Sequence, residues 1–125
     1  MNLIPFKSAL SVAIIDVPIY MYHLPEEVTK GILILHSMSG VKLTSELPGY
    51  KKGKFQVIVR IGNNFQDGYQ TALSIIEAFK TVQNKTYDGV YIHFVEPLND
   101  PIAFPKSKGS FIEFSLNFST AYTEN

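Results

Sequence analysis

Histidines are the side chains in this sequence best suited to bind a metal or to transfer a proton. The three histidines, His23, His36 and His93, lie far apart, and none has a second ligand at the short spacings typical of metal sites. Their convergence in the folded chain is an alternative that the sequence leaves open. His93 alternates with Tyr91 and Val95 on one face of a predicted strand. We therefore expect His93 to be a structural histidine and expect no metal site.

Nucleophiles and acid–base pairs are equally sparse. No serine stands in the Gly-x-Ser-x-Gly turn that exposes a catalytic serine, and the segment SKGS at 107–110 lacks the pattern of a phosphate-binding loop. Glu26 and Glu27 lie in an expected turn, and Glu77 lies on the polar side of an expected helix. The chain has no cysteine, so disulfides, thiolate metal sites and a cysteine nucleophile are excluded. We expect no enzymatic activity and no cofactor.

One cluster of basic residues, Lys51, Lys52 and Lys54, could contact a polyanion. The chain as a whole has 11 basic and 11 acidic residues and a formal net charge of zero. Strong binding to nucleic acid needs several clustered cations, and the flanking aromatics Tyr50 and Phe55 do not form a stacking platform. The cluster is either a solvated turn or a loop that faces an acidic partner or passing DNA. A neutral chain favours association with other subunits.

The N-terminal segment is predicted to be a helix over about residues 4–16. Pro5 suits the first turn of a helix, where its missing N–H costs nothing. Asp16 ends the apolar run, and no small-residue cleavage site follows, so we do not expect a signal peptide. Apolar residues recur at helical spacing until Pro18, at Phe6, Leu10, Ala13 and Val17.

Strands and turns are predicted between this helix and residue 62. The segment 31–37 is apolar on both faces, which favours a central strand, and 55–61 alternates cleanly. In the second segment Gln56, Ile58 and Arg60 share one face, opposite Phe55, Val57, Val59 and Ile61. We further expect a short strand at 19–24, a strand or extended arm at 41–47, and a turn at Leu47–Lys54.

A second helix should begin near Asn64. Asn64 and Asp67 have the spacing of a helix cap, and the chain turns again at residues 87–89. The predicted buried face consists of Phe65, Tyr69, Leu73, Ile76 and Phe79, joined by Ala72 and Val82.

The last third of the sequence predicts two strands joined by an extended connection. In the strand at 90–96, Val90, Ile92 and Phe94 share one face, and the connection at 97–109 contains three prolines. The final strand at 111–119 alternates along its whole length. Its inward residues are Ile112, Phe114, Leu116 and Phe118, and its outward residues are Glu113, Ser115, Asn117 and Ser119.

These elements predict a single α+β domain over residues 1–125. We expect one mixed, mainly antiparallel sheet with the N-terminal helix and one long central helix packed on it. A helix that follows a strong strand implies a crossover and some parallel pairing, while the last two strands can pair as a long hairpin.

The order of several motifs resembles one protein family. The segment LPEEVTKGILILHSMSGVKLTSELPGYKKGKFQVIVRIG is similar to the central part of tailed-bacteriophage minor capsid or tail terminator (tail completion) proteins. A helix, a strand, a proline-rich stretch like EPLNDPIAFPKSKG and a closing strand like FIEFSLNF follow in the same order. The resemblance covers roughly residues 24–120, and its specificity lies in the joint order of the motifs.

This resemblance implies a structural role in the neck or tail of a virion that is assembled in the bacterial cytoplasm. Such subunits form a homo-oligomer, a hexameric ring, that caps the finished tail tube and stops its polymerisation. The implied partners are the tail tube protein and a connector or head-completion protein. DNA would pass through the channel without sequence-specific binding, and no catalysis, cofactor, metal or membrane is implied.

Two groups of residues are candidate contact sites. A polar, weakly charged lining would let DNA slide, so the outward strand residues should face the channel or a neighbouring subunit; they are Gln56, Arg60, Glu113, Ser115, Asn117 and Ser119. The Leu47–Lys54 turn and the Leu98–Gly109 connection should contact neighbours, the tube or the connector, through Tyr50, Lys51, Lys52, Lys54, Asn99, Asp100, Phe104, Lys106 and Lys108.

Other interpretations remain open at the level of sequence. The apolar residues Ile58, Tyr91 and Phe104 could supply the two unlike patches that a ring needs, while the polar residues could simply meet solvent. The alternative functions are another neck protein of the same assembly module and, after it, a small dimeric ligand-binding α+β protein.

Overall fold

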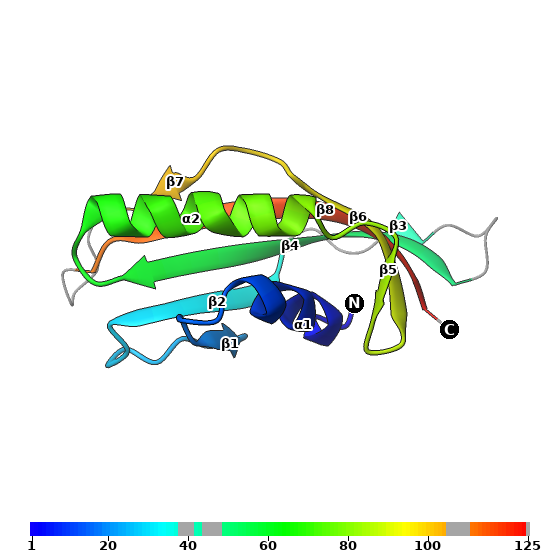
Figure 1. The fold of residues 1–125 in the computed structure, drawn as a ribbon, viewed down its shortest axis with the longest axis horizontal. Helices are drawn as coiled ribbons and strands as arrows, with labels where there is room; N and C mark the ends of the chain where they lie inside the picture. Colours follow the sequence, from blue (N-terminus) through cyan, green and yellow to red (C-terminus); the bar gives the residue numbers. More distant parts are fainter. Residues whose placement is uncertain (38–41, 44–48, 105–110, 125) are drawn as a thin grey trace.

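The computed structural model describes residues 1–37, 42–43, 49–104 and 111–124 (Figure 1). Two helices and eight strands occur in these residues. In chain order they are α1 (Ile4–Ala13), β1 (Ile19–Met21), β2 (Lys30–His36), β3 (Lys42–Leu43), β4 (Tyr50–Ile61), α2 (Phe65–Lys80), β5 (Lys85–Tyr87), β6 (Val90–Pro97), β7 (Ile102–Ala103) and β8 (Glu113–Glu124).

The strands form one sheet in the order β1-β2-β4-β8-β6-β5, with β3 beside β4 and β7 beside β8. Only β1 and β2 pair in parallel in the described part of the chain, and the other pairs are antiparallel. The α+β class with a mixed, mainly antiparallel sheet is thus confirmed, as is the pairing of β6 with β8. The crossover after β4 gives no parallel pair, because α2 leads from β4 to β5 and both β8 and β6 lie between these two strands in the sheet.

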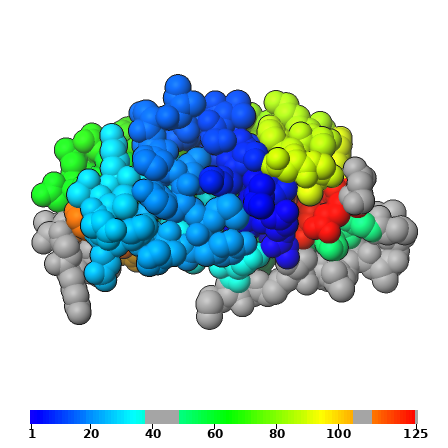
Figure 2. All heavy atoms as spheres, turned by 90° about the horizontal axis from the view of Figure 1, so that it is seen from below, coloured from blue at the N-terminus to red at the C-terminus, as the bar shows by residue number. Residues whose placement is uncertain are grey.

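Both helices pack on one face of the sheet, and α1 closes the curl of that sheet. α1 contacts α2 and also β1 and β5, the strands at the two ends of the sheet order. Seen from below, α1 (dark blue) fills the space between the β1–β2 region (light blue) and the β5–β6 hairpin (yellow-green) (Figure 2). The single core therefore lies between the sheet and the two helices.

An aromatic cluster forms the centre of this core. The ring of Phe55 on β4 lies 4.9 Å from Phe6 on α1, 5.3 Å from Phe79 on α2 and 5.3 Å from Phe118 on β8, measured between ring centroids. All four side chains are fully buried. One side chain from each of four elements thus meets at Phe55, as the alternation of β4 and β8 predicts.

The buried face of α2 differs from the predicted face. Asn64 caps the helix by accepting a hydrogen bond from the Asp67 N–H at 3.1 Å, as expected. However, Phe65 is 48% exposed and Leu73 is only partly buried. The residues that face the core are Gly68, Ala72, Ile75, Ile76 and Phe79.

The reason for this rotation is a close approach at Gly68. A Cβ atom at this position would lie 2.8 Å from the ring of Phe114 on β8, closer than such contacts occur in proteins. Glycine lets the first turns of α2 lie directly on β8. An apolar periodicity does not count glycine as a core residue, so the predicted face includes Phe65 and Leu73 in place of Gly68 and Ile75.

α1 is shorter than predicted and ends at Ala13. Ile14 is already extended, with φ −113° and ψ 99°. Ile14, Ile15 and Val17 are β-branched, and a residue that precedes proline disfavours the helical conformation, so the segment before Pro18 leaves the helix early. Ala13 is consequently exposed, whereas Val17 is buried by the chain that follows the helix.

β4 and β8 are longer than predicted, and this overturns the turn expected at Leu47–Lys54. Tyr50–Lys54 belongs to β4 because β8 continues to Glu124, so that Tyr50 pairs with Thr123 and Lys54 with Ser119. Gly49, with φ +78°, provides the turn before the strand. Residues 44–48, which contain the rest of the expected turn and most of the expected arm, lie outside the described residues.

A β-bulge changes the inward residues of β6. The register shifts between Ile92 and Phe94, so Val95 is buried at 3% exposure, while Phe94 is only partly buried. The prediction that Val90, Ile92 and Phe94 share the inner face was therefore wrong for Phe94. A bulge inserts one extra residue, which a strict two-residue period does not anticipate.

Tyr122 provides a test of the core at high pH. Its side chain is 1% exposed, and its hydroxyl has no hydrogen-bond partner in the described residues. Burial, with a smaller contribution from Glu124, raises the pKa of Tyr122 above the ordinary 10.0. The unfolded chain therefore loses this proton at a lower pH than the folded chain does. The contribution of the protonated Tyr122 to the free energy of unfolding is therefore intact below about pH 10 and is lost as the pH rises above that value.

We expect Tyr122→Phe to remove this loss of stability at high pH. At neutral pH the variant should be as stable as the wild type or more stable by about 1 kcal/mol, because a buried unpaired hydroxyl disappears. Urea unfolding at pH 7 and at about pH 11 should show a smaller fall for the variant than for the wild type. An equal fall in both proteins would show that Tyr122 does not titrate differently in the two states.

Candidate functional site

The face of the sheet that the helices leave uncovered, here called the outer face, carries the first group of predicted site residues. The register of β4 and β8 pairs Arg60 with Glu113, Ile58 with Ser115, Gln56 with Asn117 and Lys54 with Ser119. Paired residues project to the same side of a sheet. The six residues predicted to face outward together therefore do lie side by side on one surface.

Arg60 occupies a special position among them because it is only 8% exposed. Its Nε and Nη2 atoms each lie 2.9 Å from Oε2 of Glu113, and its Nη1 donates to the carbonyl oxygens of Pro25 and Val28, both at 2.9 Å. The guanidinium carbon also lies 5.1 Å from the ring centroid of Phe111. Arg60 thus ties the chain between β1 and β2 to the start of β8.

A row of polar side chains continues along the outer face from this ion pair. Gln56 Nε2 donates to Ser115 Oγ at 2.7 Å, and Asn117 Nδ2 donates to Asn99 Oδ1 at 3.2 Å. Ser115 is buried at 3% exposure, whereas Gln56, Asn117 and Ser119 are partly exposed. This row offers hydrogen-bonding groups at its surface but little net charge.

The basic cluster is divided between the two faces of β4. Lys51 forms an ion pair with Glu124, with Nζ and Oε2 3.0 Å apart. Lys52 and Lys54 are exposed on the outer face, and neither has a carboxylate partner in the described residues. Two free cations are too few for a strong phosphate-binding surface.

His93 lies at the end of the outer face beside these lysines. Its Nε2 is 2.7 Å from Thr123 Oγ1, and its ring lies 5.2 Å from Tyr50 and 4.8 Å from Tyr91. It is thus held by its neighbours in the sheet, as we expect of a structural histidine. No group of three or more His, Cys, Asp or Glu residues suitable for a metal occurs in the described part of the chain.

The connection between β6 and β8 holds the remaining described candidates. It is not wholly irregular, because β7 pairs with β8 at Ser115 and Phe114. Asn99 is partly buried by its bond with Asn117, while Asp100 and Phe104 are exposed, the latter by 37%. Lys106 and Lys108 lie outside the described residues.

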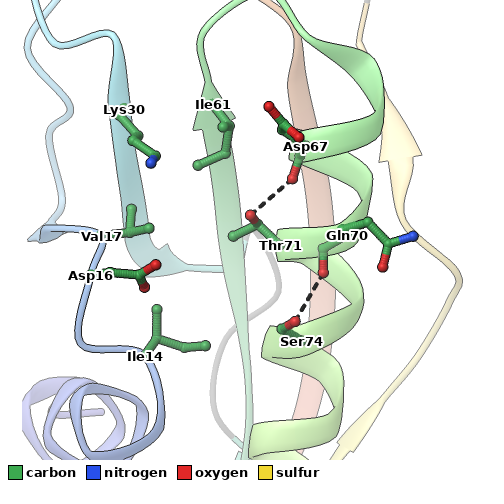
Figure 3. Close-up of a pocket in the computed structure, with 9 residues that line it drawn as sticks. All are labelled: Ile14, Asp16, Val17, Lys30, Ile61, Asp67, Gln70, Thr71 and Ser74. Carbon is green, nitrogen blue, oxygen red and sulfur yellow. Dashed lines mark hydrogen bonds between the residues drawn. The ribbon is translucent and has the colours of Figure 1, made fainter.

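A groove on the helix side of the molecule was missed by the sequence analysis. It has a volume of about 400 Å³ and lies between α2, the chain after α1, and the ends of β2 and β4 (Figure 3). Asp16 and Lys30 point into it, and Asp67 lies at its end. The hydroxyls of Thr71 and Ser74 donate to the backbone carbonyl oxygens of Asp67 and Gln70 in α2.

The described residues thus present a polar outer face and a groove beside α2. A model of the bacteriophage tail terminator protein family matches residues 6–124. The chain belongs to that family. The resemblance inferred from the order of the motifs is thereby confirmed.

Membership in the tail terminator family establishes the broad role of the chain. The family consists of structural phage proteins, so the chain is a component of the virion tail and has partners in tail assembly. No helix in the described residues is long and apolar enough to cross a membrane.

Other comparisons add little. No curated protein is significantly similar to the chain in sequence. One solved structure is similar to this chain with 15% sequence identity and a TM-score of 0.49, and the match covers 96% of each of the two chains. This similarity is too distant to support an argument about function.

Proposed function

We propose that this chain is a single-domain tail terminator subunit. Copies of it form a hexameric ring that caps the tail tube, stops its polymerisation and provides the surface for head-to-tail joining. The observation that carries this proposal is the family match over residues 6–124. The partners would be the tail tube protein and a connector or head-completion protein, and assembly would occur in the host cytoplasm.

The middle of the outer face suits a channel or a subunit joint. The charge of Arg60 is neutralised there by Glu113, and the exposed Lys52 and Lys54 lie toward the start of β4. The accessible side chains of Gln56, Asn117 and Ser119 are polar and uncharged, which suits a surface past which DNA slides. In this proposal Arg60 and Ser115 hold the surface in shape, because both are buried.

The candidate contacts would serve the neighbours and the tube. Tyr50, Lys52 and Lys54 lie on β4, and Asn99, Asp100 and Phe104 lie in the connection between β6 and β8. Lys106 and Lys108 belong to the same proposal. No step in this function requires a reaction, a cofactor or a metal.

Purified protein tests the capping activity directly. We expect tubes that are growing from purified tail tube protein to stop lengthening after this protein is added, with a ring visible at one end by negative-stain electron microscopy. The same protein unfolded by heat is the matched control. Tubes that grow equally long with folded protein, without a ring, would contradict capping.

A further inference from the structure

A second, apolar groove continues the polar groove beside α2. It has a volume of about 550 Å³ and is lined mainly by Ala13, Ile14, Leu73 and Ala78. The two grooves share Ile14 and Ser74 as lining residues, so they form one surface along the helix. We call this surface, with Asp16 and Asp67 at its polar end, the acidic groove.

The chain segment that contributes Ala13, Ile14 and Asp16 to the acidic groove also carries exposed apolar residues. Val12 and Ile15 flank its lining residues along the chain and are 76% and 86% exposed. They are the most exposed large hydrophobic side chains in the described residues. An exposed apolar segment that adjoins a groove along the chain suits a protein partner.

The charges of the groove indicate what its occupant carries. The carboxylates of Asp16 and Asp67 form no ion pair in the described residues, and Lys30 is the single cation among the lining residues of the polar part. An occupant that brings a cation next to an apolar side chain would therefore be complementary to it.

The same chain presents such a surface on the opposite face of its sheet. Lys52 and Lys54 are exposed on the outer face, and the partly buried Phe94 lies across Ala121 from Lys52 in the strand register. We call Lys52, Lys54 and Phe94 the basic strip. It lies on the outer face while the groove lies on the helix side, so the two cannot meet within one copy.

We infer that the basic strip of one copy docks into the acidic groove of the next copy. Two unlike patches on opposite faces join subunits head to tail. Such a contact builds a closed ring when the rotation from each copy to the next brings the last copy back to the first. This inference rests on the proposed function for the closure of the ring, and it names the surfaces that form the joint.

Cysteine crosslinking tests the contact, because the chain has no cysteine of its own. Asp16→Cys and Lys54→Cys are made separately and together, and a phage with a nonsense mutation in the gene is complemented with each. The purified particles are treated with a short bismaleimide. Particles that contain a mixture of the two single variants should give crosslinked dimers. Particles that contain the double variant should give a ladder of crosslinked oligomers. Asp16→Cys with Lys85→Cys is the matched control, since Lys85 is exposed but lies on β5.

The outcomes separate this inference from the proposed function. Two results would overturn the head-to-tail joint but leave the terminator role intact. In the first, infectious particles show no crosslink between positions 16 and 54. In the second, copies of one single variant crosslink to each other. A crosslink in purified protein, combined with normal tails in the nonsense mutant, would keep the joint and remove the terminator role.

A charge exchange gives a second readout that does not depend on the crosslinker. Asp16→Lys and Lys54→Asp should each weaken association roughly fivefold, because one opposite-charge pair becomes a like-charge pair. The variant that carries both charge exchanges should recover the wild-type association, as measured by sedimentation of the purified proteins. Thermal unfolding of each variant checks the fold, and single exchanges that leave association unchanged would count against the joint.

Discussion

Replacing Arg60 by alanine is expected to lower the free energy of unfolding by about 3 kcal/mol, because the change leaves a partly buried carboxylate without its partner. Glu113 would lose both of its bonds to the guanidinium, and the carbonyl oxygens of Pro25 and Val28 would lose a donor. Urea unfolding followed by circular dichroism measures the loss.

Two further variants show whether the unpaired charge causes this loss. Lys80→Ala removes an exposed ion pair with Glu77 and should cost only about 0.3 kcal/mol. The double variant Arg60→Met/Glu113→Leu leaves no charge unpaired and should be more stable than Arg60→Ala. A loss for Arg60→Ala no larger than that for Lys80→Ala would contradict the structural role of Arg60.

Replacing Phe55 by alanine should have the largest effect in the core, about 4 kcal/mol of destabilisation. The ring of Phe55 contacts fully buried rings from α1, α2 and β8, so its removal leaves a cavity in the centre of the core. Calorimetry should show a clear fall in Tm.

Phe65→Ala is the matched control for Phe55→Ala. Phe65 also contacts two aromatic rings, Tyr69 and Phe114, but its side chain is 48% exposed. We expect a loss of about 1 kcal/mol or less. Similar losses for Phe55→Ala and Phe65→Ala would show that the aromatic cluster is not the centre of the core.

The alternation of residues explains how much of the outer face could be predicted. The two-residue period at 55–61 and again at 112–118 assigns Gln56 and Asn117 to the face opposite Phe55 and Phe118, and the structure confirms this. The two-residue period does not reveal how exposed each outward residue is, because other segments of the chain cover part of the outer face. Ser115 has the sequence pattern of a solvent-exposed residue but is buried.

Long-range partners explain most of what the sequence did not reveal. Arg60 is held by Pro25 and Val28, which are 35 and 32 residues away, and no local pattern signals such a contact. The acidic groove likewise requires α1 to end early and lie beside α2. The β-branched run before Pro18 was a usable signal for that end, and Gly68 was the signal for the packing of α2.

The ends of the strands illustrate the same limit. Tyr50–Lys54 contains a glycine and three lysines and is typical of a turn, yet it forms a strand because β8 extends far enough to pair with it. Pairing with a neighbour therefore overrode local propensity. This outcome places Lys52 and Lys54 in fixed positions on the outer face, where the proposed joint requires them.

Electron microscopy of lysates from a phage with a nonsense mutation in the gene tests most directly whether this chain ends the tail and prepares it for the head. We expect overlong or ragged tails beside DNA-filled heads without tails, and recovery when the wild-type chain is supplied. Tails of normal length that only fail to attach would indicate a neck protein on the head side, and intact infectious particles would contradict a role in assembly altogether.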